Sequence, residues 1–188
     1  MSSLRQLVAS LRMLLVLTVL LGVLYPAVVW GVGRAGLSDR ADGSLVSRDG
    51  RVVGSSLLGQ DFKGPKWFHG RPSASAYAGG VSGGSNLAAS AQGQVSAVRE
   101  RQAAWPGIGE GAAPADALTA SASGLDPHVS PANALAQVSR VAAANGVEAS
   151  AVRQLVDAHT QGRSLGFLGE PRVNVLELNL ALEELAHQ

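Results

Sequence analysis

The sequence contains no cysteine, and several other residue types are scarce. Without cysteine, the chain has no disulfide, no thiolate zinc ligand and no cysteine nucleophile. Only eight of the 188 residues are aromatic, and only two, Lys63 and Lys66, are lysine. The net charge is +1, so the chain lacks the basic surplus typical of nucleic-acid-binding proteins. We therefore expect no nucleic-acid partner.

Charged residues are missing altogether from residues 13–33, whereas the other 167 residues carry all 15 basic and all 14 acidic side chains. A helix of these 21 residues would span about 31 Å, close to the roughly 30 Å core of a bilayer. A cleaved signal peptide would have a shorter apolar run and a small-residue cleavage site. The pattern favours an uncleaved membrane anchor. One such segment is too little for a pore built by this chain alone.

The flanks of the apolar segment predict its orientation. Residues 1–12 carry Arg5 and Arg12 and no acidic residue, and short basic tails stay in the cytoplasm. Long domains cross largely regardless of charge. We therefore predict a cytoplasmic tail over 1–12, a transmembrane helix over 13–33 and an extracytoplasmic domain over 34–188. Within the span, Pro26 predicts a kink that packs against partner helices, and Trp30 suits the membrane interface.

The first part of the soluble domain predicts a small sheet followed by an ordered loop. Residues 44–55 read as a β-hairpin around Asp49-Gly50. Glycine and serine are frequent after that, yet five of the six aromatics outside the anchor fall within 54–114. Because disordered segments are poor in aromatics, we expect an irregular loop that packs on the domain. A helix is predicted over 87–104.

The last third predicts helices. Ser130-Pro131 forms an N-cap with proline at the first helical position, and Asn145-Gly146 ends that helix. A second helix is expected over 148–160. The run 174–177 resembles a capping box before an apolar helical stripe, although 173–182 also alternates as a strand would. The predicted class is one N-terminal transmembrane helix plus one α+β domain with a small antiparallel sheet and a mainly helical C-terminal third.

Two patterns raise the possibility of serine chemistry. Residues 80–84 match G-x-S-x-G, but their flanks are rich in Ala, Gly and Ser rather than a strand and a helix. A triad with Ser82 would recruit Asp126 and His128. The intervening Pro127 predicts a turn that directs these two side chains apart, so a role in leading the chain to Ser130 is favoured. Hydrolase chemistry stays a minor alternative.

Other ligand signals are weak. Neither lysine stands in a Walker A pattern, although the glycines of 81–85 could hold a phosphate through backbone amides. The four histidines show no metal-ligand spacing, so we predict no metal site. Asn133, Gln137 and Arg140 form one polar stripe. A solvated helix face is the simpler interpretation, and contact with a ligand or partner is the alternative.

Six blocks in register resemble the C subunit of the bacterial high-affinity potassium-transporting P-type ATPase, the Kdp complex. A single span with Tyr25-Pro26 precedes them. The blocks are GSSLLGQ at 54–60, WFHGRPS at 67–73, SGGSN at 82–86, DALTASASGLDPHVSP at 116–131, Gln137 with RVA at 140–142, and LGEPRVNVLELN at 168–179. The resemblance covers nearly the whole chain. It implies an accessory, non-catalytic subunit in the cell membrane.

The resemblance also implies the partners and the site. The partners would be a channel-like potassium-binding subunit, a catalytic P-type ATPase subunit, a small single-span subunit and the lipid bilayer. The subunit would stabilise their assembly and raise the ATP affinity of the catalytic subunit, with Gln137 as the nucleotide contact. No cofactor is expected on this chain itself, and ATP would enter only through the complex. The predicted interface residues are Tyr25, Pro26, Trp30, Trp67, Phe68, Arg71, Ser82, Gly83, Gly84, Ser85, Asn86, Asp126 and His128.

The predicted orientation and the implied nucleotide contact conflict with each other. The predicted orientation puts Gln137 outside the cell, where ATP is absent, so the subunit would instead brace the channel-like partner near the potassium entrance. The other hypotheses are an independent membrane-tethered binding or assembly domain and, third, a tethered serine hydrolase.

Overall fold

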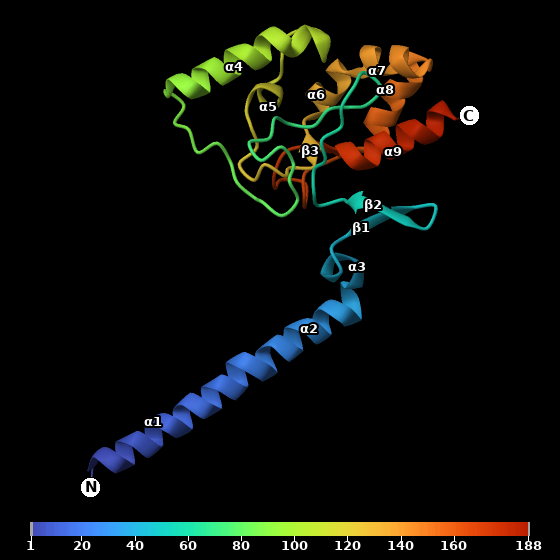
Figure 1. Cartoon of the computed structure of the whole chain (residues 1–188). Helices are drawn as coiled ribbons and strands as arrows, with labels where there is room; N and C mark the ends of the chain where they lie inside the picture. Colours follow the sequence, from blue (N-terminus) through green and yellow to red (C-terminus); the bar gives the residue numbers. More distant parts are fainter. Residues whose placement is uncertain (1, 188) are drawn as a thin grey trace. The chain divides into compact units, whose positions relative to one another are not determined.

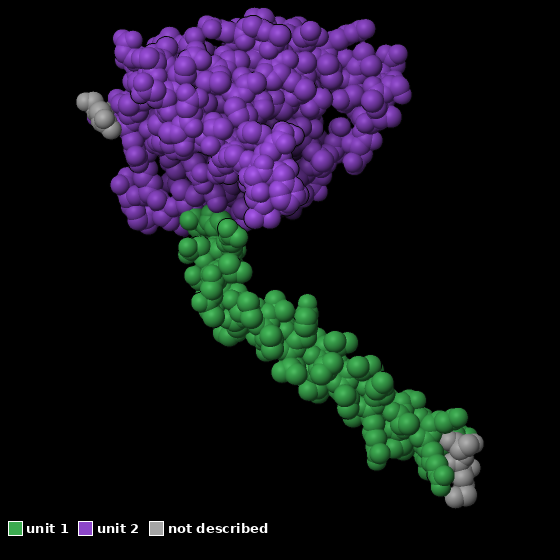
Figure 2. Space-filling view, turned by 180° about the vertical axis from the view of Figure 1, so that it is seen from behind, with its two compact units in different colours: residues 1–45 green, residues 46–188 purple. Residues whose placement is uncertain are grey.

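The computed structural model describes residues 2–187, and the chain divides into two compact units. Unit 1 is Met1–Leu45 and unit 2 is Val46–Gln188, drawn in green and purple in Figure 2. The boundary lies within the first strand of the predicted hairpin, about a dozen residues beyond the apolar segment. The two units therefore separate the apolar helix from the α+β domain.

Unit 1 is mainly helical. Helix α1 (Ser2–Val19) runs into a π-helical turn, η1 (Leu20–Leu24), and then into α2 (Tyr25–Gly36), followed by the short α3 (Ser38–Ala41). Residues 3–36 form the one helix in the described chain that is long and apolar enough to cross a membrane, and none of its apolar stretch is buried within the chain. The predicted long apolar helix is thus present, with polar ends that extend beyond 13–33.

The disturbance expected at Pro26 takes the form of the π-turn. The Tyr25 N–H donates to the Leu20 carbonyl, five residues back. Proline has no N–H and crowds the carbonyl four residues earlier, which here belongs to Gly22 inside the turn. The wider turn lets the helix continue past this point, and π-turns of this kind are frequent at functional sites.

Unit 2 opens with the predicted hairpin, β1 (Leu45–Arg48) and β2 (Arg51–Ser55). Asp49 and Gly50 both have positive φ angles, 50° and 75°, which is the type I′ geometry that this dipeptide favours. Arg48 ties the hairpin to the C-terminal helix through an ion pair of 2.6 Å with Glu183. The turn signal in the sequence is therefore confirmed.

A second, three-stranded antiparallel sheet has the order β3-β5-β4. Its strands are short: β3 (His128–Val129), β4 (Thr160–Gln161) and β5 (Arg172–Asn174). Val173 of the central strand pairs with Val129 on one side and Thr160 on the other. Strands β3 and β5 lie more than forty residues apart in the sequence. The irregular loop between β2 and α4 runs beside the sheet (Figure 1).

The remaining elements are helical, which confirms the predicted α+β class. They are α4 (Gln92–Ala104), a 3₁₀ turn η2 (Trp105–Gly107), α5 (Ala115–Leu118), α6 (Pro131–Ala136), α7 (Val138–Asn145), α8 (Ala149–Ala158) and α9 (Val175–Ala186). Helix α4 begins five residues later than predicted. The expected continuous helix over 131–145 is wrong, because it is interrupted at Gln137.

The predicted caps account for the helix ends. Ser130 Oγ accepts from the Asn133 N–H at 3.1 Å, and Asn174 Oδ1 accepts from the Glu177 N–H at 3.2 Å. Gly146 takes the left-handed conformation after α7. Both alternatives for 173–182 hold in part, because the end of β5 meets the start of α9 at the Asn174 cap.

The core lies where α6, α7, α8 and α9 meet the three-stranded sheet (Figure 1). Its fully buried members are mostly valine and leucine, and Phe68 is the one large aromatic among them, at 0% exposure. The core cluster is Phe68, Val129, Ala134, Val138, Val141, Ala142, Val152, Val156, Val173, Val175, Leu178 and Leu182. Phe68 comes from the irregular loop, so the loop packs on the domain as predicted.

Candidate functional site

The candidate site centres on residues 64–69, a segment with no helix or strand whose backbone is held by side chains of α7, of α9 and of Gln137, which lies between α6 and α7. We call this segment the clamped loop. Helix α9 supplies Asn179, and Gln137 together with α7 supplies the rest. A backbone outside regular structure must find hydrogen-bond partners elsewhere. Here the partners are amide and guanidinium groups rather than another strand.

Two buried amides each pair with both polar groups of one loop residue. The Phe68 N–H donates to Asn179 Oδ1 at 2.8 Å, and Asn179 Nδ2 donates back to the Phe68 carbonyl at 3.0 Å. The next residue repeats this pattern, because the His69 N–H donates to Gln137 Oε1 at 2.8 Å and Gln137 Nε2 donates to the His69 carbonyl at 3.1 Å. These pairs resemble a short stretch of antiparallel ladder.

The earlier part of the loop is fixed through its carbonyl oxygens. Arg140 donates to Pro65 at 2.6 Å and to Trp67 at 3.0 Å, and Asn145 Nδ2 donates to Lys66 at 2.8 Å. A further bond joins Arg140 Nη2 to Gln137 Oε1 at 2.7 Å. Burial lowers the pKa of Arg140, since desolvation disfavours its charged form. These bonds satisfy three consecutive carbonyls of the loop and hold its backbone in place.

The predicted polar stripe is real, but its expected environment is wrong. Asn133 and Gln137 are each 1% exposed, so this helix face is not solvated. Gln137 accepts two hydrogen bonds on its oxygen and donates both amide protons, the second to Asn133 Oδ1 at 2.9 Å. A glutamine amide has no more than this capacity. Gln137 is satisfied by the chain itself.

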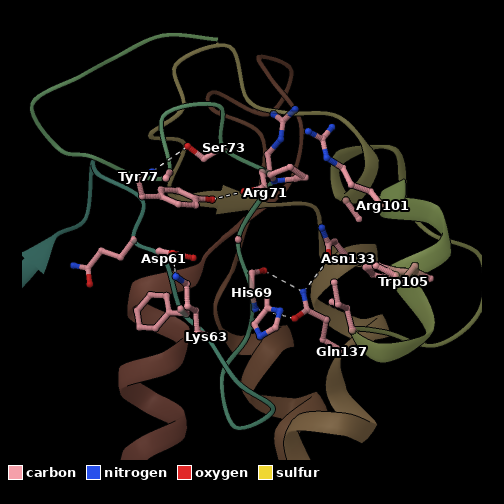
Figure 3. A pocket seen from close by; sticks show the side chains of 18 of the residues that line it. Asp61, Lys63, His69, Arg71, Ser73, Tyr77, Arg101, Trp105, Asn133 and Gln137 are labelled. Atoms are coloured by element: carbon pink, nitrogen blue, oxygen red, sulfur yellow. Dashed lines mark hydrogen bonds and ion pairs between the residues drawn. The ribbon is translucent and has the colours of Figure 1, made fainter. Parts of the chain in front are cut away.

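A cavity of about 450 Å³ lies beside the clamped loop (Figure 3). Gln137 and Asn133 lie at its edge, and its charged lining consists of Asp61, Lys63, Arg71 and Arg101. Burial lowers the pKa of His69, whose ring Nε2 lies 2.8 Å from the Gly64 carbonyl. The neutral ring thus donates from Nε2, and the cavity keeps its cationic character through lysine and arginine.

Arg71 and its neighbours form the far wall of the cavity. Arg71 Nη1 lies 3.1 Å from Asp126 Oδ2, and the Tyr77 hydroxyl donates to the Arg71 carbonyl. Burial, with the negative charges of Asp126 and Asp61, raises the pKa of Tyr77 to about 12, so it remains a donor at neutral pH. Although burial opposes it, hydrogen bonds from His128 and Arg71 lower the pKa of Asp126.

The predicted interface residues fall into three places. Tyr25 and Trp30 are 64% and 68% exposed on the membrane helix, where Pro26 is also exposed. Phe68 is wholly buried in this chain's core, so it can shape an interface only by anchoring the clamped loop. The remaining positions are exposed or half-buried on the irregular loops and around the sheet: Trp67, Arg71, Ser82, Gly83, Gly84, Ser85, Asn86, Asp126 and His128.

The serine hydrolase motif lacks its required setting. No strand precedes Ser82 and no helix directly follows it, and its hydroxyl donates to the Ser123 carbonyl at 3.3 Å. Asp126 and His128 do not point apart as predicted, since Asp126 Oδ1 lies 3.6 Å from His128 Nδ1. Asp126 Oδ1 also accepts the His128 N–H at 3.0 Å and so closes the expected turn. That turn, rather than a catalytic role, explains why Asp126 and His128 lie close together.

Sequence reasoning missed two polar residues that organise the site. Asn179 lies on the same face of α9 as Val175 and Leu182, and a lone amide in an apolar stripe is a signal for a buried hydrogen bond. Asp116 accepts from the Ser130 N–H at 2.7 Å, the Ser130 hydroxyl at 3.0 Å and Asn133 Nδ2 at 3.1 Å. No local pattern marks that contact, because its partners lie at least fourteen residues away.

The described residues contain no group of three or more His, Cys, Asp or Glu side chains that could hold a metal ion. The groups that converge at the site are instead backbone carbonyls, which accept hydrogen bonds, and the side-chain amides and guanidinium group that donate to them. Such a set fixes a loop in place and presents a surface. It does not supply a nucleophile with its base.

A long apolar helix joined to a small α+β domain is consistent with a membrane subunit. The family model for the K⁺-transporting ATPase c chain, KdpC, matches residues 7–184. The chain therefore belongs to the KdpC family, and it is an accessory subunit of the potassium-transporting Kdp ATPase.

Similar proteins cover almost the full length of the chain. The potassium-transporting ATPase KdpC subunit of Kineococcus radiotolerans is 54% identical over 189 residues, with 97% of this chain and 95% of the relative covered. The KdpC subunit of Sorangium cellulosum is 53% identical, with 93% and 95% covered. That of Cereibacter sphaeroides is 50% identical, with 93% and 94% covered. The family predicted from the six sequence blocks is confirmed.

Proposed function

We propose that this chain is an extracytoplasmic brace for the potassium pump. In this arrangement residues 1–12 are cytoplasmic, the single helix crosses the cell membrane, and the domain rests on the channel-like potassium-binding subunit near the potassium entrance. The short basic tail and the long domain after the span support this orientation. Because the chain belongs to the KdpC family, we propose this role in place of an independent tethered domain.

The main support for the proposal is the way in which side chains hold the clamped loop. Burying Gln137 and Asn179 costs free energy unless their amides are bonded, and here both amides bind the loop backbone. The loop so fixed leaves Gly64, Pro65 and Lys66 exposed. A rigid exposed loop binds with little loss of conformational entropy, which suits a docking surface.

The membrane helix supplies the second contact. Its apolar side chains are unburied within the chain, and Tyr25 and Trp30 project from it. We propose that the π-turn before Pro26 packs against the helices of the channel-like subunit and of the small single-span subunit, where neighbouring groups satisfy the freed carbonyl. The catalytic P-type ATPase subunit is then reached through these partners.

Any effect on ATP follows from assembly in this proposal, and Gln137 makes no nucleotide contact. The support is its saturated, buried amide. The test measures the ATP concentration for half-maximal potassium-stimulated hydrolysis by the complex containing Gln137→Ala or Asn179→Ala. Both variants loosen the same loop, so we expect similar shifts. A shift confined to Gln137→Ala would restore the nucleotide role.

Cysteine labelling tests the orientation, because the natural chain contributes no background thiol. Ser150 is exposed on α8, and Ser3 is exposed in the predicted cytoplasmic tail. With an impermeant maleimide on intact cells, Ser150→Cys should react and Ser3→Cys should react only after permeabilisation. The reverse pattern would place the domain in the cytoplasm and end the brace model.

Co-purification tests the assembly itself. The full chain, expressed with the other pump subunits, should be retained with them in mild detergent and should support growth at limiting potassium. Deleting residues 1–45 should remove both properties. Recovery of the wild-type chain only as a free monomer would contradict the proposal.

A further inference from the structure

The loop between β4 and β5 exposes the two least buried large hydrophobic side chains in the described part of the chain. Leu165 is 82% exposed and Phe167 is 70% exposed, and both exceed every large hydrophobic residue of the membrane helix. Leu168 follows at 49%. All ten residues of 161–170 are exposed. We call residues 163–170 the apolar hairpin.

The apolar hairpin has a defined conformation. The backbones of Ser164 and Leu168 exchange two hydrogen bonds, each 2.9 Å long, and form an antiparallel bridge. At its base, Arg163 and Glu170 form an ion pair of 2.8 Å. The three apolar side chains are therefore carried on a closed turn whose shape the chain itself determines.

Leu165 has a backbone conformation that leucine rarely adopts. Its φ angle is 53°, in the left-handed region that asparagine and glycine accept and a branched aliphatic residue avoids. It is the only large aliphatic residue with positive φ among those described. An exposed leucine in this position stabilises neither the turn nor the core. Local strain of this kind points to function.

We propose that the apolar hairpin inserts into an apolar pocket on the extracytoplasmic face of an integral-membrane subunit of the same pump. This inference rests on the proposed function, because it requires the domain to be outside the cell and beside its partners. It adds a further contact surface, separate in sequence from the clamped loop and the membrane helix, and assigns it an apolar partner.

The size of the hairpin argues for a partner in the same membrane. Three side chains of at most about 150–250 Å² each fall short of the roughly 800 Å² that each partner buries in a stable free complex. A second copy or a soluble protein would not be held by this surface alone. A subunit already confined beside the anchor helix needs far less area, because tethering raises its effective concentration.

The fixed geometry favours a protein pocket over lipid. Insertion into a bilayer rewards apolar area in any conformation. A bridged turn with a strained leucine presents Leu165 and Phe167 in one arrangement, which matters only to a surface of complementary shape. The test must therefore distinguish contact with lipid from contact with a protein pocket.

The first test replaces Leu165→Asn together with Phe167→Ser in the full chain expressed with its pump subunits. Asparagine suits the left-handed φ, so the variant chain should keep or raise its melting temperature. Its retention by the complex should fall at least about tenfold, as expected when two apolar anchors are lost. Leu87→Ser, which removes an apolar side chain that is 48% exposed elsewhere, is the control and should leave retention unchanged.

The second test places the photocrosslinking residue p-benzoylphenylalanine at position 167 in the assembled pump. A crosslink to a membrane subunit is expected. Crosslinks only to lipid, only to a second copy, or none at all would overturn the inference. If wild-type chain is not retained by the pump, the proposed function fails. If wild type and the double variant are retained equally, only the role of the hairpin fails.

Discussion

Asn179 and Gln137 occupy the place that the backbone of a neighbouring strand would take. Each side-chain amide donates one bond and accepts one bond from a single loop residue, Phe68 or His69. An amide can do this because it carries the same donor and acceptor as a peptide unit. The loop is thereby ordered without a strand, and the apolar Phe68 ring can be held in the core.

The clamp predicts a stability cost at Gln137. Gln137→Ala leaves the His69 N–H and carbonyl without partners inside the protein, at about 1–3 kcal/mol for each buried group. We expect the free energy of unfolding to fall by roughly 2–4 kcal/mol, measured by urea denaturation of the full chain in detergent. Gln154→Ala, on the exposed face of α8, is the matched control and should change little. Equal stability of the two variants would contradict the clamp.

His69 predicts a pH dependence. Burial holds its pKa below 6.5, so the unfolded chain takes up a proton at higher pH than the folded chain does. Stability should therefore decline as the pH falls from 6.5 toward the folded pKa. In His69→Gln this component is lost, and unfolding midpoints at about pH 7.5 and about pH 5.5 should differ less than in wild type. A larger difference in the variant would refute the assignment.

At the level of elements, the break at Gln137 divides what periodicity alone predicts as one helix. The Gln137 N–H bonds to the Ala134 carbonyl three residues back, at 3.1 Å, rather than four. Apolar spacing runs through the break, so the pattern could not reveal it. The tighter turn directs the Gln137 side chain at the clamped loop. The tertiary contact therefore sets this helix boundary.

The stability of α6 should depend on Asp116, a residue outside the helix. It binds the cap residue Ser130 twice and Asn133 once, at the first turn of the helix. Asp116→Ala should lower the free energy of unfolding by about 2–3 kcal/mol, because hydrogen bonds to a charged group are lost and a backbone N–H is orphaned. Calorimetry beside Asp157→Ala, an exposed acid on α8, checks this. A loss no greater than that of the control would count against it.

For the whole molecule, every residue of the core cluster lies in unit 2. We therefore predict that residues 46–188 fold without the anchor. Their melting temperature should lie within about 3 °C of the value for the full chain, since a shift of that size corresponds to less than 1 kcal/mol. Circular dichroism of the truncated domain checks this. A chain without a cooperative transition would show that the anchor contributes to the fold.

Local signals in the sequence determined a large part of this protein. The uncharged run predicted the long apolar helix, Asp49-Gly50 predicted the hairpin, and Ser130 and Asn174 predicted the starts of two helices. Each signal acts between residues within one turn or one span, where propensity and hydrogen bonding are set by neighbours along the chain. The six blocks also identified the family.

Only the tertiary structure decided what the polar residues and the exposed loops do. Gln137 reads along the chain as a solvated or nucleotide-binding residue, yet its partner is a loop 68 residues earlier. Likewise, nothing in residues 163–170 marks Leu165 as exposed and strained, because both properties depend on what fails to cover it. Burial and long-range hydrogen bonding are properties of the folded chain, so no local pattern in the sequence can show them.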